Sequence, residues 1–96
     1  MTTATQPIAR VKLGAIQAAI WKNVSEKGTH YNATIERGYR DANGNPKSTG
    51  SFGTNDLLLA IKVMDLAHTR MMELHREDRE AERAQQEAAA NAGHQR

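Results

Sequence analysis

The clearest pattern in the sequence is an alternation of apolar and polar side chains over residues 29–40. The odd positions from Tyr31 to Tyr39 are mainly apolar, with Arg37 as the polar intrusion, and the even positions are mainly polar. A period of two is typical of a strand with one buried face and one exposed face. We therefore predict a β-strand over residues 29–40.

The preceding segment, residues 10–23, has a mixed pattern. Apolar residues recur there with helical spacing, whereas the β-branched residues, the tryptophan and an interior glycine favour a strand. We predict a strand. Residues 24–28 are polar and end in glycine, which is typical of a longer hairpin loop leading into the strand over residues 29–40.

Residues 41–46 carry the strongest turn signal in the chain. The pair Asn43-Gly44 supplies the positive φ values of a tight hairpin turn, and Pro46 cannot continue a central strand. A short strand over residues 47–52 follows. The predicted sheet is a three-stranded antiparallel meander, or a four-stranded one if residues 8–14 pair separately.

A long helix is predicted from Leu57 onward, because apolar residues recur at spacings of four and three and Gly93 is the first interruption. It reaches up to about 35 residues, with Thr54 or Asn55 as its cap and Asp56 in its first turn. Its first half is amphipathic and is expected to pack on the sheet. Residues 76–92 offer only alanines as apolar groups, so we expect this part to fray.

These elements define an α+β protein in which a meander is followed by one long C-terminal helix. We expect a disordered leader over residues 1–7, one domain over residues 8–75 and a charged helical tail over residues 76–96. A folding unit of roughly 70 residues has a core that supplies only about 3–5 kcal/mol. Because the first strand is also apolar on both faces, we expect a homodimer to cover an apolar face or an unpaired strand edge. The alternative is a monomer with a poorly covered face.

Composition narrows the class of protein. The chain has 96 residues and no cysteine, so it has no disulfide, thiol nucleophile or thiolate metal site. No apolar run approaches the roughly 18 residues of a membrane span. The first residues also lack the features of a secretory signal. We expect a cytoplasmic protein without a membrane partner.

Charge divides the chain into two unlike halves. Residues 1–53 carry seven basic and three acidic side chains, a net charge of +4, and residues 54–96 carry six and eight, a net charge of −2. All the aromatic residues lie in the basic half. Basic surface attracts polyanions and aromatic rings stack on unpaired bases, although surface charge and core aromatics are also ordinary features of a small domain. The predicted nucleic-acid-binding residues are Lys12, Trp21, Lys22, Lys27, Tyr31, Arg37, Tyr39, Arg40 and Lys47.

Other chemistry finds little support in the sequence. His68 and His75 are two helical turns apart, about 10 Å, and cannot share one metal ion. The acidic residues of the helix interleave with arginines, as on a solvated face. Residues 50–54 precede a helix N-terminus, where phosphate can bind, but they lack the lysine of a nucleotide-binding loop. We expect no catalytic residue, no metal ligand, no cofactor and no enzymatic activity.

A further pattern extends over residues 8–72 and consists of Trp21-Lys22-Asn23, Lys27-Gly28, Tyr31-Asn32, Thr34, Arg37, Tyr39, Asp41, Lys47, Thr49, Ser51-Phe52, Asp56-Leu57 and Ala67-His68. In this pattern the chain resembles a family of short uncharacterised bacterial and mobile-element proteins. This resemblance implies no particular activity. The order of strands and helix resembles, at the level of the fold, the dimeric single-stranded-DNA-binding proteins of the positive-cofactor and Whirly type.

Two functions are expected on these grounds. The first is a small non-enzymatic protein that binds nucleic acid, namely single-stranded DNA or RNA with little sequence preference, through its basic, aromatic-bearing sheet. The alternative is a protein-interaction module, acting as an accessory or inhibitory factor. Its long amphipathic helix would dock on another protein or on a second copy of the chain.

Overall fold

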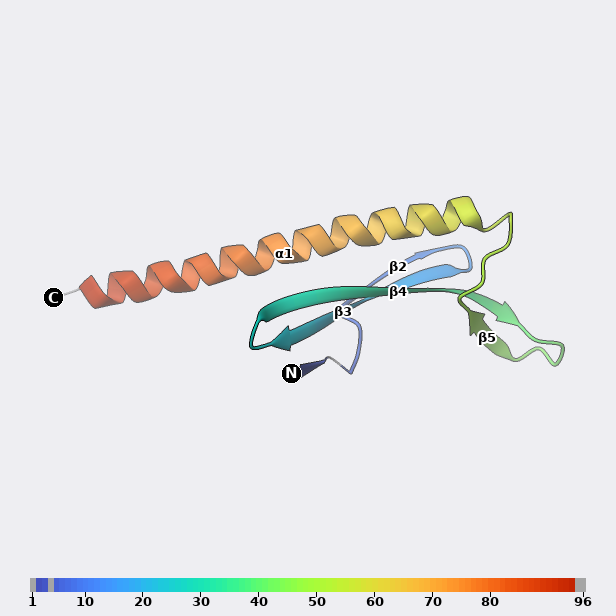
Figure 1. The fold of residues 1–96 in the computed structure, drawn as a ribbon, viewed down its shortest axis with the longest axis horizontal. Coiled ribbons are helices and arrows are strands. Elements are labelled where there is room, and N and C mark those ends of the chain that lie inside the picture. Colours follow the sequence, from blue (N-terminus) through green and yellow to red (C-terminus); the bar gives the residue numbers. More distant parts are fainter. Residues whose placement is uncertain (1, 4, 95–96) are drawn as a thin grey trace.

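The computed structural model describes residues 2–3 and 5–94 and contains one antiparallel sheet and one long helix (Figure 1). This confirms the predicted α+β class, with four main strands followed by a C-terminal helix. The strands are β1 (Thr2–Thr3), β2 (Ala9–Leu13), β3 (Ile16–Ser25), β4 (Gly28–Arg40) and β5 (Pro46–Thr49), and the helix is α1 (Leu57–His94).

The strand β3 lies at the centre of the sheet. β2 pairs with its first half and the short β1 with its second half, both antiparallel and along the same edge, while β4 pairs along the other edge. β5 pairs only with the last four residues of β4. Within the predicted leader, Thr2–Thr3 therefore belong to the sheet, and Met1 and Ala4 lie outside the described residues.

The single strand predicted over residues 10–23 is wrong, because two strands occupy this segment. Leu13 pairs with Ile16, so Gly14 and Ala15 form a two-residue hairpin turn between β2 and β3. Gly14 has a φ of 59°, a value that side chains disfavour and glycine accepts. A glycine at the first position of a two-residue turn suits the right-handed twist of a hairpin, and the four-stranded alternative is the one adopted.

The two later connections agree with the sequence to different extents. A turn is confirmed after β4, where the Asp41 carboxylate accepts the N–H groups of Asn43 and Asn45, each at 2.9 Å, and Gly44 has a φ of 80°. The positive φ expected for Asn43 is wrong, and residues 41–45 form a five-residue loop rather than a tight turn. The loop predicted over residues 24–28 is shorter than expected, because Ser25 already pairs with Gly28. The last strand likewise ends at Thr49 rather than at residue 52.

The helix begins at Leu57, and Asp56 is the residue that precedes its first turn. The Asp56 carbonyl accepts the N–H of Ala60 at 2.8 Å, and its carboxylate accepts the N–H of Gly53 at 3.2 Å. Asp56 therefore takes the cap position that was expected for Thr54 or Asn55. The helix continues through the segment for which fraying is predicted, and residues 79–90 are exposed along their whole length.

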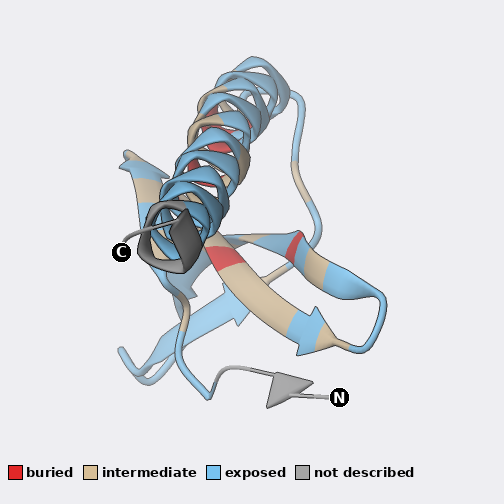
Figure 2. Cartoon of the chain, turned by 90° about the vertical axis from the view of Figure 1, so that its left-hand side faces the viewer, coloured by how far each residue is buried: buried red, intermediate tan, exposed pale blue. Residues whose placement is uncertain are grey.

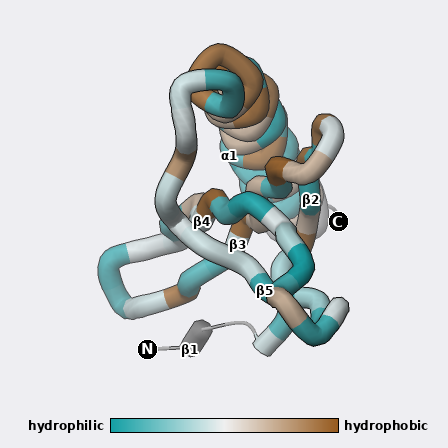
Figure 3. The backbone as a smooth tube through the Cα atoms, turned by 90° about the vertical axis from the view of Figure 1, so that its right-hand side faces the viewer, coloured by the Kyte–Doolittle hydropathy of each residue, from teal (hydrophilic) through white to brown (hydrophobic). Residues whose placement is uncertain are grey.

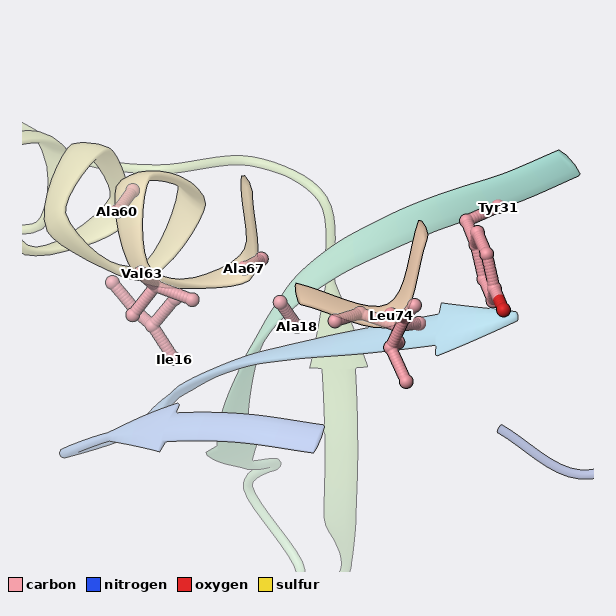
Figure 4. Close-up of a cluster of buried hydrophobic side chains, with 8 residues drawn as sticks. Ile16, Ala18, Tyr31, Ala60, Val63, Ala67 and Leu74 are labelled. Atoms are coloured by element: carbon pink, nitrogen blue, oxygen red, sulfur yellow. The ribbon is translucent and has the colours of Figure 1, made fainter. Parts of the chain in front are cut away.

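The core lies between one face of the sheet and one side of α1 (Figure 2). Val63 points toward Ile16 at one end, and Tyr31 and Leu74 lie toward the other (Figure 4). Alanines on both elements allow the helix to approach the sheet closely. The helix extends well beyond the sheet, which makes the molecule 71 Å long. The buried residues are Ile16, Ala18, Ile20, Tyr31, Ala60, Val63, Ala67 and Leu74.

Candidate nucleic-acid interface

The sheet has a face that α1 does not cover. Ile20 is buried beneath the helix, and because neighbouring strand residues point to opposite sides, Trp21 and its cross-strand partner Asn32 point away from it. We call this side the open face. From the pairing register, its side chains are Arg10, Lys12, Gln17, Ala19, Trp21, Asn23, His30, Asn32, Thr34, Glu36 and Arg40.

Trp21 is the aromatic residue of the open face. Its indole Nε1 donates a hydrogen bond to Thr34 Oγ1 on β4 at 3.1 Å, and the side chain is half-buried. The hydrogen bond fixes the ring against the sheet while part of it stays accessible. A ring held in this way can stack on a base without first losing much conformational freedom.

Two cations follow along β2 on the same face: Arg10 lies opposite Ala19, diagonal to Trp21, and Lys12 lies opposite Gln17, farther from the ring. Arg10 and Lys12 are two residues apart on β2, so both side chains reach the open face, and both are exposed. Arg10 was not among the predicted site residues, although its spacing of two from Lys12 is a signal that could have placed it there. Within strands β2 to β5, Glu36 is the acidic residue on this face.

The open face ends in a shallow hollow of about 440 Å³ at the free end of the sheet. The β4–β5 hairpin extends past the first turn of α1 there (Figure 1), so residues from both sides of the two strands reach the hollow. Arg40 is oriented by a hydrogen bond of 2.8 Å from its guanidinium to the Gly44 carbonyl. The hollow gathers three of the predicted cations with one ring, namely Lys12, Arg40 and Lys47 with Tyr39.

Tyr31 does not belong to this surface, which corrects the prediction that it stacks on a base. The side chain is only 7% exposed and lies between the sheet and α1 (Figure 4). Its hydroxyl donates a hydrogen bond to the Asp78 carboxylate, and its ring meets the His75 ring edge-on at 4.8 Å. Burial, the hydrogen bond to Asp78 and the negative charges of Asp78 and Glu77 raise the pKa of Tyr31 to about 12.

Two predicted cations serve the contact between helix and sheet. Lys22 shares the side of Tyr31 and lies 3.8 Å from Asp78 as an ion pair. Arg37 Nε lies 3.3 Å from the carboxylate of Asp56, and this contact is an ion pair without hydrogen-bond geometry. The guanidinium of Arg37 also lies 5.8 Å from the centre of the Tyr39 ring. Both cations are less available to phosphate than the exposed ones.

Lys27 lies apart from the other predicted residues. It is exposed in the turn between β3 and β4, at the opposite end of the sheet from the hollow. The predicted set is thus divided among four places. Lys12, Trp21 and Arg40 lie on the open face, Tyr39 and Lys47 at the hollow, Lys22, Tyr31 and Arg37 on the helix side, and Lys27 at the distant turn.

The described residues can also be compared with the requirements of a metal site and of a membrane-spanning helix. Across residues 2–3 and 5–94, no group of three or more His, Asp or Glu side chains is arranged to hold a metal ion. Within the same ranges, no helix combines the length and the apolar character needed to cross a bilayer.

Comparison of the chain with protein families, with curated proteins and with solved structures gave no match. The resemblance described above therefore stays a prediction from the sequence, and the functional argument rests on the geometry of the sheet.

Proposed function

We propose that this chain is a small non-enzymatic protein that binds single-stranded DNA or RNA, with little sequence preference, through the open face and the hollow at its end. The observation that carries the proposal is the position of Trp21. This ring is fixed by Thr34, partly accessible, and on the same uncovered face as Arg10, Lys12 and Arg40. Stacking on a ring beside exposed cations is how single strands are bound without base-specific hydrogen bonds.

The charges of the open face favour a polyanion over a neutral ligand. Arg10, Lys12 and Arg40, with Lys47 at the hollow, face one carboxylate, that of Glu36. The side chains presented there are donors and rings, which suit phosphates and bases. The acidic residues are concentrated on α1, on the other side of the sheet.

The test uses the fluorescence of Trp21, which is the single tryptophan of the chain. Titration with a short homopyrimidine DNA strand is expected to quench it, because a base stacks on the indole. Four phosphate contacts at roughly −0.7 each predict a slope of about −3 for log K against log salt concentration. A duplex of the same length is expected to bind more weakly, because its bases are not free to stack.

Two matched double variants distinguish binding at the open face from attraction by the overall charge of the protein. Lys12→Ala with Arg40→Ala removes two cations of the interface, and we expect the salt slope to fall to about −1.5 with a clear loss of affinity at low salt. Lys62→Ala with Arg76→Ala removes the same charge from exposed positions of α1 and should leave binding unchanged. Equal weakening by both pairs, or no quenching by any oligonucleotide at low salt, would refute the proposal.

A second function is favoured by a different observation, the exposed apolar side chains of α1. Leu58 is 80% exposed and Ile61 58%, and the residues at the start of the helix are strongly hydrophobic (Figure 3). Such a surface suits the alternative of a protein-interaction module.

Ending the chain after Glu80 tests whether the exposed tail of α1 contributes to nucleic-acid binding, and it leaves Leu58 and Ile61 in place. Residues 81–96 contain two acidic and two basic side chains, so their removal leaves the net charge unchanged, and the Tyr31–Asp78 contact is kept. Nucleic-acid binding through the open face should survive this truncation, as measured by Trp21 quenching. Loss of oligonucleotide binding on truncation would instead assign the interaction to residues 81–96 of the tail.

A further inference from the structure

Among residues 2–3 and 5–94, no strand lies beside one edge of β4 over most of its length. β3 covers the other edge from Gly28 to Arg37, and β5 pairs only with Arg37 to Arg40. The N–H of Gly38 bonds to the Ala15 carbonyl on the β3 side, so even-numbered residues direct their backbone groups toward β3. The backbone groups of the odd-numbered residues therefore point to the unpaired edge. These residues are Thr29, Tyr31, Ala33 and Ile35.

This edge lacks the usual protection against pairing. Residues 28–35 contain no charged side chain, no proline and no bulge, whereas edges that stay single usually carry one of these. The charges stand at the two ends instead. Lys27 precedes the segment and Glu36 follows it, so the antiparallel pairing proposed below places each Lys27 across from the partner's Arg37 and diagonal to the partner's Glu36.

An apolar groove runs along the same edge on the helix side. Its volume is about 210 Å³, and it lies between the edge of the sheet and α1. Ala33 on its floor is exposed, and Met64 on its wall is 49% exposed. Groove and edge together form one surface that is hydrophobic and rich in free backbone groups. The lining side chains are Ala18, Ala33, Ile35, Met64, Ala67, His68 and Met71.

We propose that a second copy of this chain occupies this surface, with the two β4 strands antiparallel about a two-fold axis at Asn32. Thr29 then pairs with the partner's Ile35, and Tyr31 with the partner's Ala33. This register uses every free backbone group of the edge, which gives about eight hydrogen bonds. A shift by two residues toward the β5 end would require the outward backbone groups of Arg37, which β5 already occupies.

The groove lies where the helices of two such copies would face each other. α1 lies mainly over β2 and β3. The β3 strands of the two copies are then three strand spacings apart, about 14 Å, whereas helices in direct contact lie about 8–10 Å apart. Long side chains must fill the difference, and the two methionines and the histidine of the groove are suited to this, because methionine adapts to irregular gaps.

The dimer would extend the open face but does not depend on nucleic-acid binding. In the joined sheet the two Trp21 side chains lie on one continuous face, about 14 Å apart. The solution mass of the protein without nucleic acid therefore tests the dimer alone.

The first experiment is sedimentation equilibrium of the full chain over a range of micromolar concentrations. We expect a dimer. Ala33→Lys places a charge in the groove and against the partner strand, and is expected to give a monomer with unchanged circular dichroism. Ala42→Lys makes the same change at an exposed position of the β4–β5 turn and should remain dimeric. A monomer throughout, or a dimer that Ala33→Lys leaves intact, would overturn the proposal.

The second experiment tests the register, and it uses the absence of cysteine from the chain. Asn32 is the residue that would face its own copy, as a non-hydrogen-bonded pair with Cα atoms about 4.5 Å apart, within the range of a disulfide. Asn32→Cys should therefore cross-link rapidly on mild oxidation. Thr34→Cys, whose two copies would lie about 13 Å apart, should not. Equal cross-linking of the two variants would contradict the register.

Discussion

At the scale of single residues, Tyr31 connects the far end of the sheet to α1. Its hydroxyl bonds to Asp78, its ring meets His75, and Lys22 pairs with the same carboxylate. Asp78 is thereby held by a hydrogen bond from β4 and an ion pair with β3. The last described side chains of α1 that contact the sheet lie in this cluster, so it fixes the direction in which the exposed part of the helix leaves the domain.

Replacement of Tyr31 by phenylalanine tests this cluster. Phenylalanine keeps the packing of the ring but removes the donor to Asp78, a hydrogen bond to a charged group. We expect Tyr31→Phe to lower the free energy of unfolding by about 1–2 kcal/mol near neutral pH. Urea denaturation followed by circular dichroism measures the difference, and an unchanged stability would mean that water replaces the tyrosine hydroxyl without cost.

The raised pKa of Tyr31 predicts how stability depends on alkaline pH. Its pKa is about 12 in the folded chain against an ordinary value of 10.0, so the folded state holds the phenolic proton more tightly. This contribution is fully present below pH 10 and is lost as the pH rises through 12. The advantage of the natural chain over Tyr31→Phe should therefore shrink between pH 10 and pH 12. A constant difference across this window would show that Tyr31 does not contribute in this way.

The role of Tyr31 marks a limit of sequence reasoning at this scale. The alternation correctly indicated that Tyr31, Ile35 and Tyr39 share one face of a strand. It could not indicate where along that face the helix ends its contact. Tyr31 lies beneath α1 and is buried, whereas Tyr39 lies at the free end and is 43% exposed. Whether a tyrosine of this face is buried or exposed therefore depends on how far α1 contacts the sheet, which is a property of packing.

At the scale of elements, the β2–β3 hairpin is the feature that the sequence pattern obscured. Its turn lacks the Asn-Gly pair that marks the β4–β5 turn, and its glycine stands between two apolar segments. The interior glycine was therefore interpreted as part of one long strand. The helix and β4 were predictable because their periodic patterns extend over many residues, which makes the period unambiguous.

Substitution of Gly14 tests the hairpin directly. Gly14→Ala introduces a side chain at a φ of 59°, with Leu59 Cδ2 3.4 Å from the new Cβ. We expect the free energy of unfolding to fall by about 1–2 kcal/mol. Gly50→Ala is the matched control, since its new Cβ meets nothing within 4 Å, and it should leave stability nearly unchanged. Thermal unfolding of both variants measures the effect, and equal stabilities would show that the turn tolerates a side chain.

At the scale of the whole molecule, the basic sheet and the acidic helix form two layers of opposite charge. The sequence divides its charge at about the same point, so this polarity was predictable. The sequence could not predict which cations would form ion pairs with α1 or its cap. Lys22 and Arg37 pair with carboxylates of α1 or its cap, because these strand positions point toward the helix. The candidate interface is therefore smaller than the predicted one and is confined to the open face and the hollow.

The exposed end of α1 has a mechanical consequence. Residues 79–94 continue the helix beyond its last contact with the sheet, which corresponds to about 24 Å of helix at 1.5 Å per residue. As long as this segment is helical it is stiffer than an unstructured linker, so it would hold its two ends at a defined separation. A group attached near Ala88 would be held at a fixed distance and in a fixed direction from the domain. It could contact molecules that the sheet itself does not reach.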